Sequence, residues 1–225
     1  MSKFLLENLG AVGPVVSFRS GYLDYPFQLP QALAATGYRF SSSMTANKAL
    51  THLPFQLNHD REARQEVDIF EIPATVEDEK PPQMGSRVDE AVALARAIGR
   101  YGGSFVVLTH PNMLGHKLEF HKAFIAAVRD WAWFGSISDF GHWWAARNAV
   151  ELDTHCLQAV CTISLHAPQP IQGLALRFPR ECAYRENPRS DVAVRPIDEG
   201  IVLGRIQGDL TLRCARPRKA ADAIP

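Results

Sequence analysis

The stretch "SRVDEAVALARAIGRYGGSFVVLTHPN", Ser86 to Asn112, decides the fold. Its first half predicts a helix, because apolar residues recur at three- and four-residue intervals until a Gly-Gly pair. Ser86 and the acidic Asp89 that follows it resemble a capping box at the start of this helix. The second half, "SFVVLTH", is a continuous apolar run and predicts a buried strand that ends in His110. A helix followed directly by such a strand is the repeating unit of an α/β protein.

The same alternation runs through the first two thirds of the chain. Helices are predicted at residues 2–9, 30–37, 117–130 and 138–150, the last with Ser138 as its cap. Further strands are predicted at residues 15–18, 38–42, 67–72 and 131–137. Strands that are apolar throughout indicate a parallel sheet covered by helices. A barrel and an open doubly wound sheet both fit this pattern.

The pattern changes after about Val150. Short runs such as "VCTISL", "IVLGRI" and "LTLRC" are separated by Gly and Pro turns, and no helix signal lies among them. The sequence therefore predicts a small antiparallel, sandwich-like β domain at residues 149–216. It follows an α/β domain at residues 1–148 and precedes a frayed tail at residues 217–225.

Composition narrows the class of function. Lys plus Arg and Asp plus Glu each number 24, so the formal charge is zero. A nucleic-acid partner and an anionic membrane partner are not expected, because both need a basic surface. The N-terminal segment "MSKFLLENLG" has the character of an amphipathic helix rather than of a signal peptide, so a cytoplasmic location is the default expectation and the compartment is otherwise open.

Four cysteines lie in the last third of the chain: Cys156, Cys161, Cys182 and Cys214. None forms a C-x-x-C pair. Cys156 and Cys161 would point to opposite faces if one strand carried both. Free, buried thiols are the expected state.

Polar groups follow three of the predicted strands. Arg19 follows the first strand. The third strand contains Glu71 and leads towards Asp78, and the strand "SFVVLTH" ends in His110. Functional groups collect at the carboxyl ends of parallel strands. His110 is therefore either a general acid or base, or a histidine that satisfies a loop carbonyl. Arg19 is either a fixed cation for an anionic group or one member of a rim salt bridge.

The order of short motifs resembles the C-terminal half of the polysaccharide deacetylase family, over about residues 10–148. "FRSGY" is similar to the family motif R-x-P-Y, with Gly21 where proline is usual. "GYRFSSS" is similar to G-Y-x-x-x-S-S, and "LTHP" is similar to the final L-x-H motif. The family's Asp-x-x-Asp-Trp motif has no match. The resemblance implies an incomplete (β/α) barrel and a hydrolase that removes N-acetyl groups from amino-sugar glycans.

The resemblance also implies roles for individual residues. Arg19 would orient the catalytic-base aspartate, and the backbone N–H of Tyr22 would help to hold the oxyanion. Leu108 would line the acetyl pocket, and His110 would be the general acid that protonates the leaving amine. Glu71 and Asp78 lie in the region expected to face the substrate.

Two of the family's motifs are missing from this sequence. An Asp-Asp pair should supply the catalytic base and one ligand of a divalent, zinc-type metal, and His-x-x-x-His should supply two further ligands. Residues 1–18 contain no Asp and no His, and no later His-x-x-x-His exists. We therefore expect a truncated deacetylase-like chain that is weak or inactive alone and lacks the metal ligands. A second chain is the candidate source of the missing N-terminal half.

Two further interpretations stay open at this point. The chain could be a non-catalytic carbohydrate-binding or interaction protein that uses its tryptophans, which are Trp131, Trp133, Trp143 and Trp144. It could also be a degraded remnant with exposed parallel strand edges, which favour aggregation.

Overall fold

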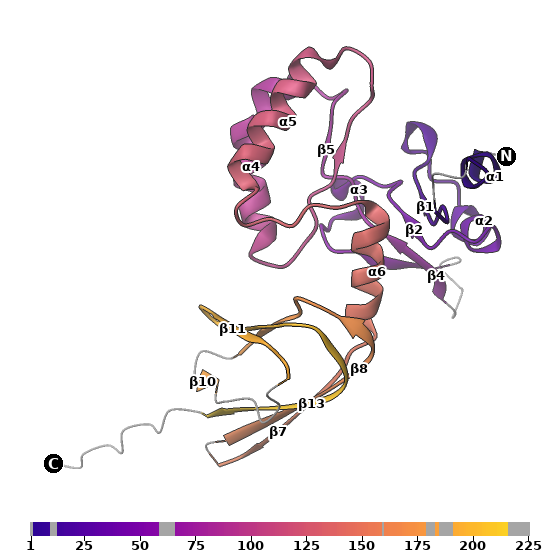
Figure 1. Ribbon diagram of the computed structural model, residues 1–225. Helices are drawn as coiled ribbons and strands as arrows, with labels where there is room; N and C mark the ends of the chain where they lie inside the picture. Colours follow the sequence, from indigo (N-terminus) through magenta and orange to yellow (C-terminus); the bar gives the residue numbers. More distant parts are fainter. Residues whose placement is uncertain are drawn as a thin grey trace. The chain divides into compact units, whose positions relative to one another are not determined.

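Mixed α/β structure with several sheets is observed in the computed structural model, which describes residues 2–9, 13–58, 66–158, 160–178, 183–184 and 191–215 (Figure 1). The chain forms two compact units, residues 1–141 and 142–225. The division falls inside helix α6 (Ile137–Asn148), whereas the predicted domain boundary at 148/149 lies at the end of that helix.

Parallel strands organise the first unit. One sheet has the order β1 (Ser17–Phe18), β2 (Phe40–Ser41), β4 (Glu66–Glu71), with β3 (Phe55–Asn58) antiparallel at the outer edge of β4. A second, two-stranded parallel sheet pairs β5 (Val76–Glu77) with β6 (Val107–Leu108). A parallel bridge between Thr45 and Ala74 continues the pairing between the chain after β2 and the chain before β5. The parallel strands thus follow one another in sequence order and point the same way.

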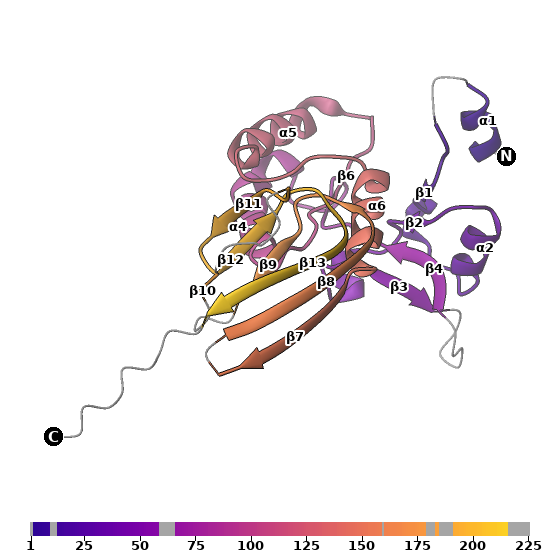
Figure 2. The ribbon, with the colours of Figure 1, turned by 60° about the horizontal axis from the view of Figure 1, so that its bottom comes forward.

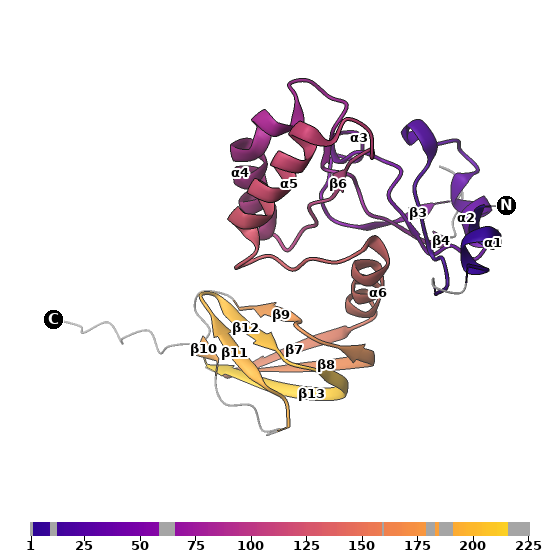
Figure 3. The same ribbon diagram turned by 45° about the horizontal axis from the view of Figure 1, so that its top comes forward.

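Helices alternate with these strands along the chain. They are α1 (Ser2–Glu7), α2 (Leu29–Ala35), α3 (Ala46–Ala49), α4 (Val88–Gly99) and α5 (Leu114–Val128), with 3-10 turns at Gly21–Leu23 and Met84–Arg87. Helices α4 and α5 lie side by side (Figures 1 and 3). Apolar side chains of both helices form one core with Met84, namely Ala91, Ala95, Phe120, Phe124 and Val128.

Several details of the first unit differ from the sequence prediction. The described parallel strands form two sheets, β1-β2-β4 and β5-β6, and a (β/α) barrel is not shown, so the incomplete barrel stays a prediction. Residues 131–136 form no strand, and Trp131 and Trp133 are 45% and 64% exposed. The capping box is wrong, because Ser86 lies in a 3-10 turn and its hydroxyl donates to the carbonyl of Gln83 at 2.8 Å. Ser138 lies inside α6 rather than before it.

Antiparallel strands form the second unit. One sheet has the order β10 (Ala183–Tyr184), β13 (Ile206–Ala215), β8 (Val160–Ile171), β7 (Glu151–Leu157), and the other has β11 (Val194–Ile197), β12 (Gly200–Leu203), β9 (Ala175–Arg177) (Figures 2 and 3). Inward-facing residues of both sheets share one apolar core, which includes Ile163, Leu165, Ile201, Leu203 and Leu212. In β8 and β13 buried and exposed residues alternate, as expected for strands with one face on a core.

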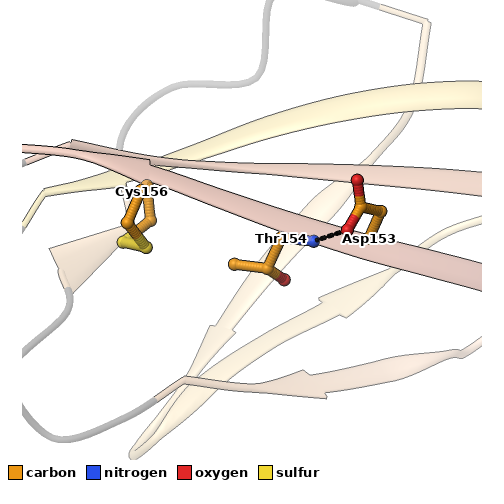
Figure 4. The surroundings of a disulfide bond; sticks show 4 residues. Asp153, Thr154 and Cys156 are labelled. Atoms are coloured by element: carbon orange, nitrogen blue, oxygen red, sulfur yellow. Dashed lines mark hydrogen bonds between the residues drawn. A yellow bond between two sulfur atoms is a disulfide. The ribbon is translucent and has the colours of Figure 1, made fainter.

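The prediction of free thiols is wrong. Cys156 of β7 and Cys161 of β8 form a disulfide with a Cα–Cα distance of 4.0 Å (Figure 4). The chain reverses between Leu157 and Val160, so the two cysteines lie opposite each other on neighbouring strands instead of on one strand. Cys214 is disulfide-bonded as well, and Cys182 lies outside the described residues.

Strand β7 is an edge strand, and one of its outward-facing backbone N–H groups is hydrogen-bonded to a side chain. The short Cα–Cα distance of the Cys156–Cys161 pair marks it as a non-hydrogen-bonded pair of the ladder. Thr154, two residues before Cys156, is in the same phase, so its N–H points away from β8 toward the free edge. The Oδ1 atom of Asp153 accepts this N–H at 2.8 Å (Figure 4).

Among the described residues, no helix has the length and apolar character needed to cross a bilayer.

Candidate functional site

Asp78 and His110 meet at the carboxyl ends of two adjacent parallel strands, because each follows the last paired residues of β5 and β6. The Oδ2 atom of Asp78 accepts the backbone N–H of His110 at 2.8 Å. Its Oδ1 atom contacts the Nδ1 atom of the His110 ring at 2.9 Å. One buried carboxylate thus fixes both the backbone and the ring of this histidine.

Lys117 of α5 completes this cluster. Its ammonium group contacts Asp78 Oδ2 at 2.5 Å and donates to the carbonyl of His110 at 3.2 Å and to Oδ1 of Asn112 at 2.9 Å. An ammonium group has three N–H donors, so these three acceptors satisfy it fully. The Lys117 side chain is 7% exposed and the Asp78 side chain is fully buried, so this is a buried ion pair with its hydrogen bonds made.

The electrostatics of the cluster keep Asp78 ionised. Burial by itself would raise the pKa of the Asp78 carboxyl. The hydrogen bonds from Lys117 and from His110, together with the charge of Lys117, outweigh that effect and hold the pKa of Asp78 well below its ordinary value. Since the carboxylate accepts only, the His110 nitrogen that faces it, Nδ1, carries a proton.

The opposite nitrogen of the ring is available for chemistry. The His110 side chain is 47% exposed, and its Nε2 atom has no hydrogen-bond partner among the described residues. Glu79, the residue after Asp78, brings a second carboxylate oxygen to 3.6 Å from Nδ1. An imidazole held at one nitrogen and open at the other can accept or donate a proton through the open one.

Arg19 follows β1 at the same end of the parallel strands. Its Nε donates to the carbonyl of Ser42 at 2.8 Å, and its Nη2 donates to the Ser42 hydroxyl at 2.8 Å. The guanidinium therefore ties the end of β1 to the end of β2. Burial lowers the pKa of Arg19, and the negative charge of Glu71 opposes that effect. The sequence left open whether Arg19 is a fixed cation or one member of a salt bridge. Among the described residues, no carboxylate lies within ion-pair distance of Arg19.

Glu71 lies inside the unit. The residue is 0% exposed, and its Oε1 accepts the backbone N–H groups of Ser43 and Met44 at 2.7 and 2.8 Å. Its Oε2 is buried and has no hydrogen-bond partner among the residues that the structure describes. Burial raises the pKa of Glu71, whereas the hydrogen bonds from Met44 and Ser43 and the charge of Arg19 act in the opposite direction. In this conformation Glu71 anchors the chain that leaves β2 and does not reach the surface, so its role in substrate binding stays a prediction.

Tyr22 and Leu108 have contrasting surroundings. Tyr22 has a left-handed backbone, with φ 57°, and its side chain is 101% exposed. A non-glycine residue with positive φ is uncommon and frequently marks a functional turn. Leu108 is the second residue of β6 and is 7% exposed, two residues before His110. The roles of both residues remain predictions.

Two groups of residues therefore lie at the carboxyl ends of the parallel strands: Arg19 with Ser42, and Asp78 with His110 and Lys117. No hydrogen bond or ion pair joins Arg19 to His110 in the part of the chain that the structure describes. Within the same residues, no group of three His, Cys, Asp or Glu side chains is placed to hold a metal ion. The described residues therefore do not fit the divalent metal that the family resemblance implies.

Sequence reasoning missed Lys117, although a signal for it exists. The buried residues of α5 are Lys117, Phe120, Phe124 and Val128, which recur every three or four residues. A lysine on the apolar stripe of a helix is unusual, because its charge needs a buried partner. Leu118 and Ile125, two other apolar residues of this helix, are 49% and 42% exposed and lie outside the buried stripe.

A shallow hollow of 530 Å³ lies on the second unit, over the outward face of β7, β8 and β13. In this hollow the ring Nδ1 of His166 and Oδ1 of Asp209 lie 2.6 Å apart. The hollow is also lined by hydroxyl and carboxylate groups, namely those of Glu151, Asp153, Ser164 and Thr211.

Comparison with known proteins supports the fold and no more. No family model matches the chain, and no curated protein matches it. A solved structure from Mycobacterium smegmatis, described as a candidate polysaccharide deacetylase, aligns with a TM-score of 0.51 at 18% identity. The alignment covers 65% of this chain and 54% of that one, so the match extends over about half the length of the solved structure. The aligned part of the chain thus has a deacetylase-like fold.

Proposed function

We propose that this chain carries the general-acid part of a polysaccharide deacetylase-like site, which hydrolyses the amide of an N-acetylated amino sugar. The observation that carries the proposal is the buried Asp78 bound to a half-exposed His110 at the carboxyl ends of adjacent parallel strands. The deacetylase-like fold and the order of the sequence motifs support it. The glycan itself, an acetylated amino-sugar oligomer, is part of the proposal.

His110 would act at the step that breaks the amide C–N bond. In its protonated form the ring donates Nδ1–H to Asp78 and presents Nε2–H to the leaving nitrogen. The Nε2 proton moves to that nitrogen as the C–N bond breaks, which releases a free amine, and the acetyl group leaves with the oxygen of water as acetate. Arg19, the Tyr22 backbone N–H and Leu108 would act as the family resemblance implies, by orienting the base, holding the oxyanion and lining the acetyl pocket.

The base and the metal ligands must come from residues that this sequence does not contain. The Asp-Asp and His-x-x-x-His motifs are absent from the 225 residues. We expect a further segment or a second chain to contribute them, and the barrel that the fold resemblance implies would be completed by the same contribution.

The test measures acetate released from N-acetylglucosamine oligomers by the purified chain, with and without added Zn²⁺. Ring signals of His110 in nuclear magnetic resonance (NMR) spectra report glycan binding at the same site. We expect binding that perturbs His110, with release that is slow or absent and that is abolished by His110→Ala. Oligomers that leave His110 unperturbed and release no acetate would overturn the proposal.

A second function has its own support. The half-exposed Trp131 and Trp133 and the polar hollow of the second unit suit a carbohydrate-binding protein without catalytic activity. Trp144 is buried and Trp143 donates its indole N–H to the carbonyl of Gln172, so these two do not contribute a platform. Glycan binding that quenches tryptophan fluorescence, leaves His110 unperturbed and yields no acetate would favour this function over the first.

A further inference from the structure

Lys117 binds the same carboxylate that holds His110. Asp78 Oδ2 receives both the Lys117 ammonium and the His110 backbone N–H, while Oδ1 receives the ring. The Lys117 ammonium also donates a hydrogen bond to the His110 carbonyl. His110 is therefore held at its backbone N–H by Asp78, at its carbonyl by Lys117 and at its ring by Asp78.

We propose that Lys117 is a positioning residue that sets how readily His110 releases its proton. An aspartate that faces a histidine alone attracts the imidazolium and makes it hold its proton more firmly. Here the negative charge of Asp78 is already neutralised by a buried ammonium, so the carboxylate orients the ring without binding the extra proton as strongly. An acid that must give its proton to an amine gains from this arrangement.

The other groups around His110 do not replace Lys117. Glu79 lies on the same loop as Asp78 and is 69% exposed, so water screens its charge. On α5, the Nε2 atom of His121 lies 2.9 Å from the hydroxyl of Thr109, the residue before His110. Asn112 is uncharged and contacts Lys117 rather than the ring. Lys117 is thus the buried cation of this cluster.

Lysine suits the position better than arginine. The three acceptors around the ammonium lie on three separate groups, which a compact ammonium with three donors can reach. A planar guanidinium presents its donors as a rigid fork and is larger. The position therefore requires a small, buried cation rather than positive charge in general.

The test follows the ring nitrogens of His110 by NMR as pH is varied, with His110→Gln used to assign the signals. Lys117→Met removes the charge and keeps the side-chain length. Lys117→Gln removes the charge but keeps N–H donors for Asp78, which protects the fold. The control is Lys122→Met, which removes an exposed lysine of the same helix. We expect the titration midpoint of His110 to move to higher pH by roughly 1 unit in both Lys117 variants and to stay unchanged in the control.

A midpoint that stays at the wild-type value in a folded Lys117 variant would overturn the inference. If both Lys117 variants fail to fold, Lys117 is a structural residue and the inference is also overturned. The inference rests on the proposed role of His110 as an acid, but its measurement needs no substrate. A shifted midpoint in a protein that neither binds nor deacetylates glycans would contradict the proposed function and leave the coupling between Lys117 and His110 established.

Discussion

Asp78 holds His110 at two points, the backbone N–H through Oδ2 at 2.8 Å and the ring Nδ1 through Oδ1 at 2.9 Å. The first bond fixes where the chain leaves β6, and the second fixes the rotation and the tautomer of the ring. A side chain that is placed in this way loses little freedom when it acts on a bound group, which favours catalysis. The pair therefore links the stability of the unit to the chemistry proposed for it.

Asp78→Asn should destabilise the first unit most at neutral pH. The pKa of Asp78 is lowered in the folded state, so its contribution to stability is present above the unfolded-state pKa of about 3.9 and is lost as pH falls below it. Asparagine also leaves the Lys117 ammonium buried without its counter-ion, at a cost of about 3 kcal/mol. Urea unfolding at pH 6 and pH 3 measures both effects, and the difference between wild type and variant should shrink at the lower pH. Equal differences at the two pH values would contradict this account, and Glu119→Gln on the exposed side of α5 serves as control.

Glu71→Gln and Glu71→Ala should differ sharply. Gln keeps an oxygen for the N–H groups of Ser43 and Met44, whereas Ala leaves both buried N–H groups unpaired and opens a cavity, at a cost of roughly 2–4 kcal/mol. The pKa of Glu71 is raised by burial, so its ionisation reduces stability as pH rises above about 4.3. Gln lacks this effect, so its free energy of unfolding relative to wild type should improve between pH 4 and pH 7. Two variants that are equally unstable would show that the carboxyl oxygen does not support these amides.

Removing the Cys156–Cys161 disulfide should loosen one hairpin and spare the rest of its unit. The bond closes a very short loop, for which the chain-entropy relation gives about 2 kcal/mol. Hydrogen exchange of the double variant Cys156→Ala and Cys161→Ala should be faster in β7 and in the start of β8. Exchange in β12, at the centre of the other sheet, should not change. Faster exchange throughout the unit would mean that the bond holds the whole fold and not the hairpin alone.

Asp153→Ala should promote self-association through β7. Asp153 accepts a hydrogen bond from the N–H of Thr154. Without this bond, the N–H would be a free donor for another strand at the edge of the sheet. Asp153→Asn retains an acceptor oxygen and is the matched control. Sedimentation velocity at increasing protein concentration should show association of the Ala variant and less association of the Asn variant. An Ala variant that sediments like wild type would show that Asp153 is not what prevents self-association through the β7 edge.

The sequence predicted those features that depend on local periodicity. The helix at Val88–Gly99 and the apolar strand before His110 follow from spacing alone, and parallel strand ends then bring Asp78 and His110 to one edge. Contacts between distant elements could not be predicted in the same way. The contact between Asp78 and Lys117 depends on which face of α5 packs inward. The pairing of Cys156 with Cys161 depends on a chain reversal between them, which was not predicted because the two cysteines are only five residues apart. The aromatic run at residues 131–136 has the composition of a strand, but it pairs with no described strand.

The bond between Cys156 and Cys161 also bears on where the molecule is made. Structural disulfides persist in the secretory pathway, the periplasm and the extracellular space, whereas cytosolic thioredoxin and glutathione keep such thiols reduced. The redox state of this hairpin therefore depends on the compartment in which the chain folds. A host that exports the protein should therefore yield protein with the Cys156–Cys161 disulfide formed. A host that retains the protein in the cytosol should yield it with both thiols reduced.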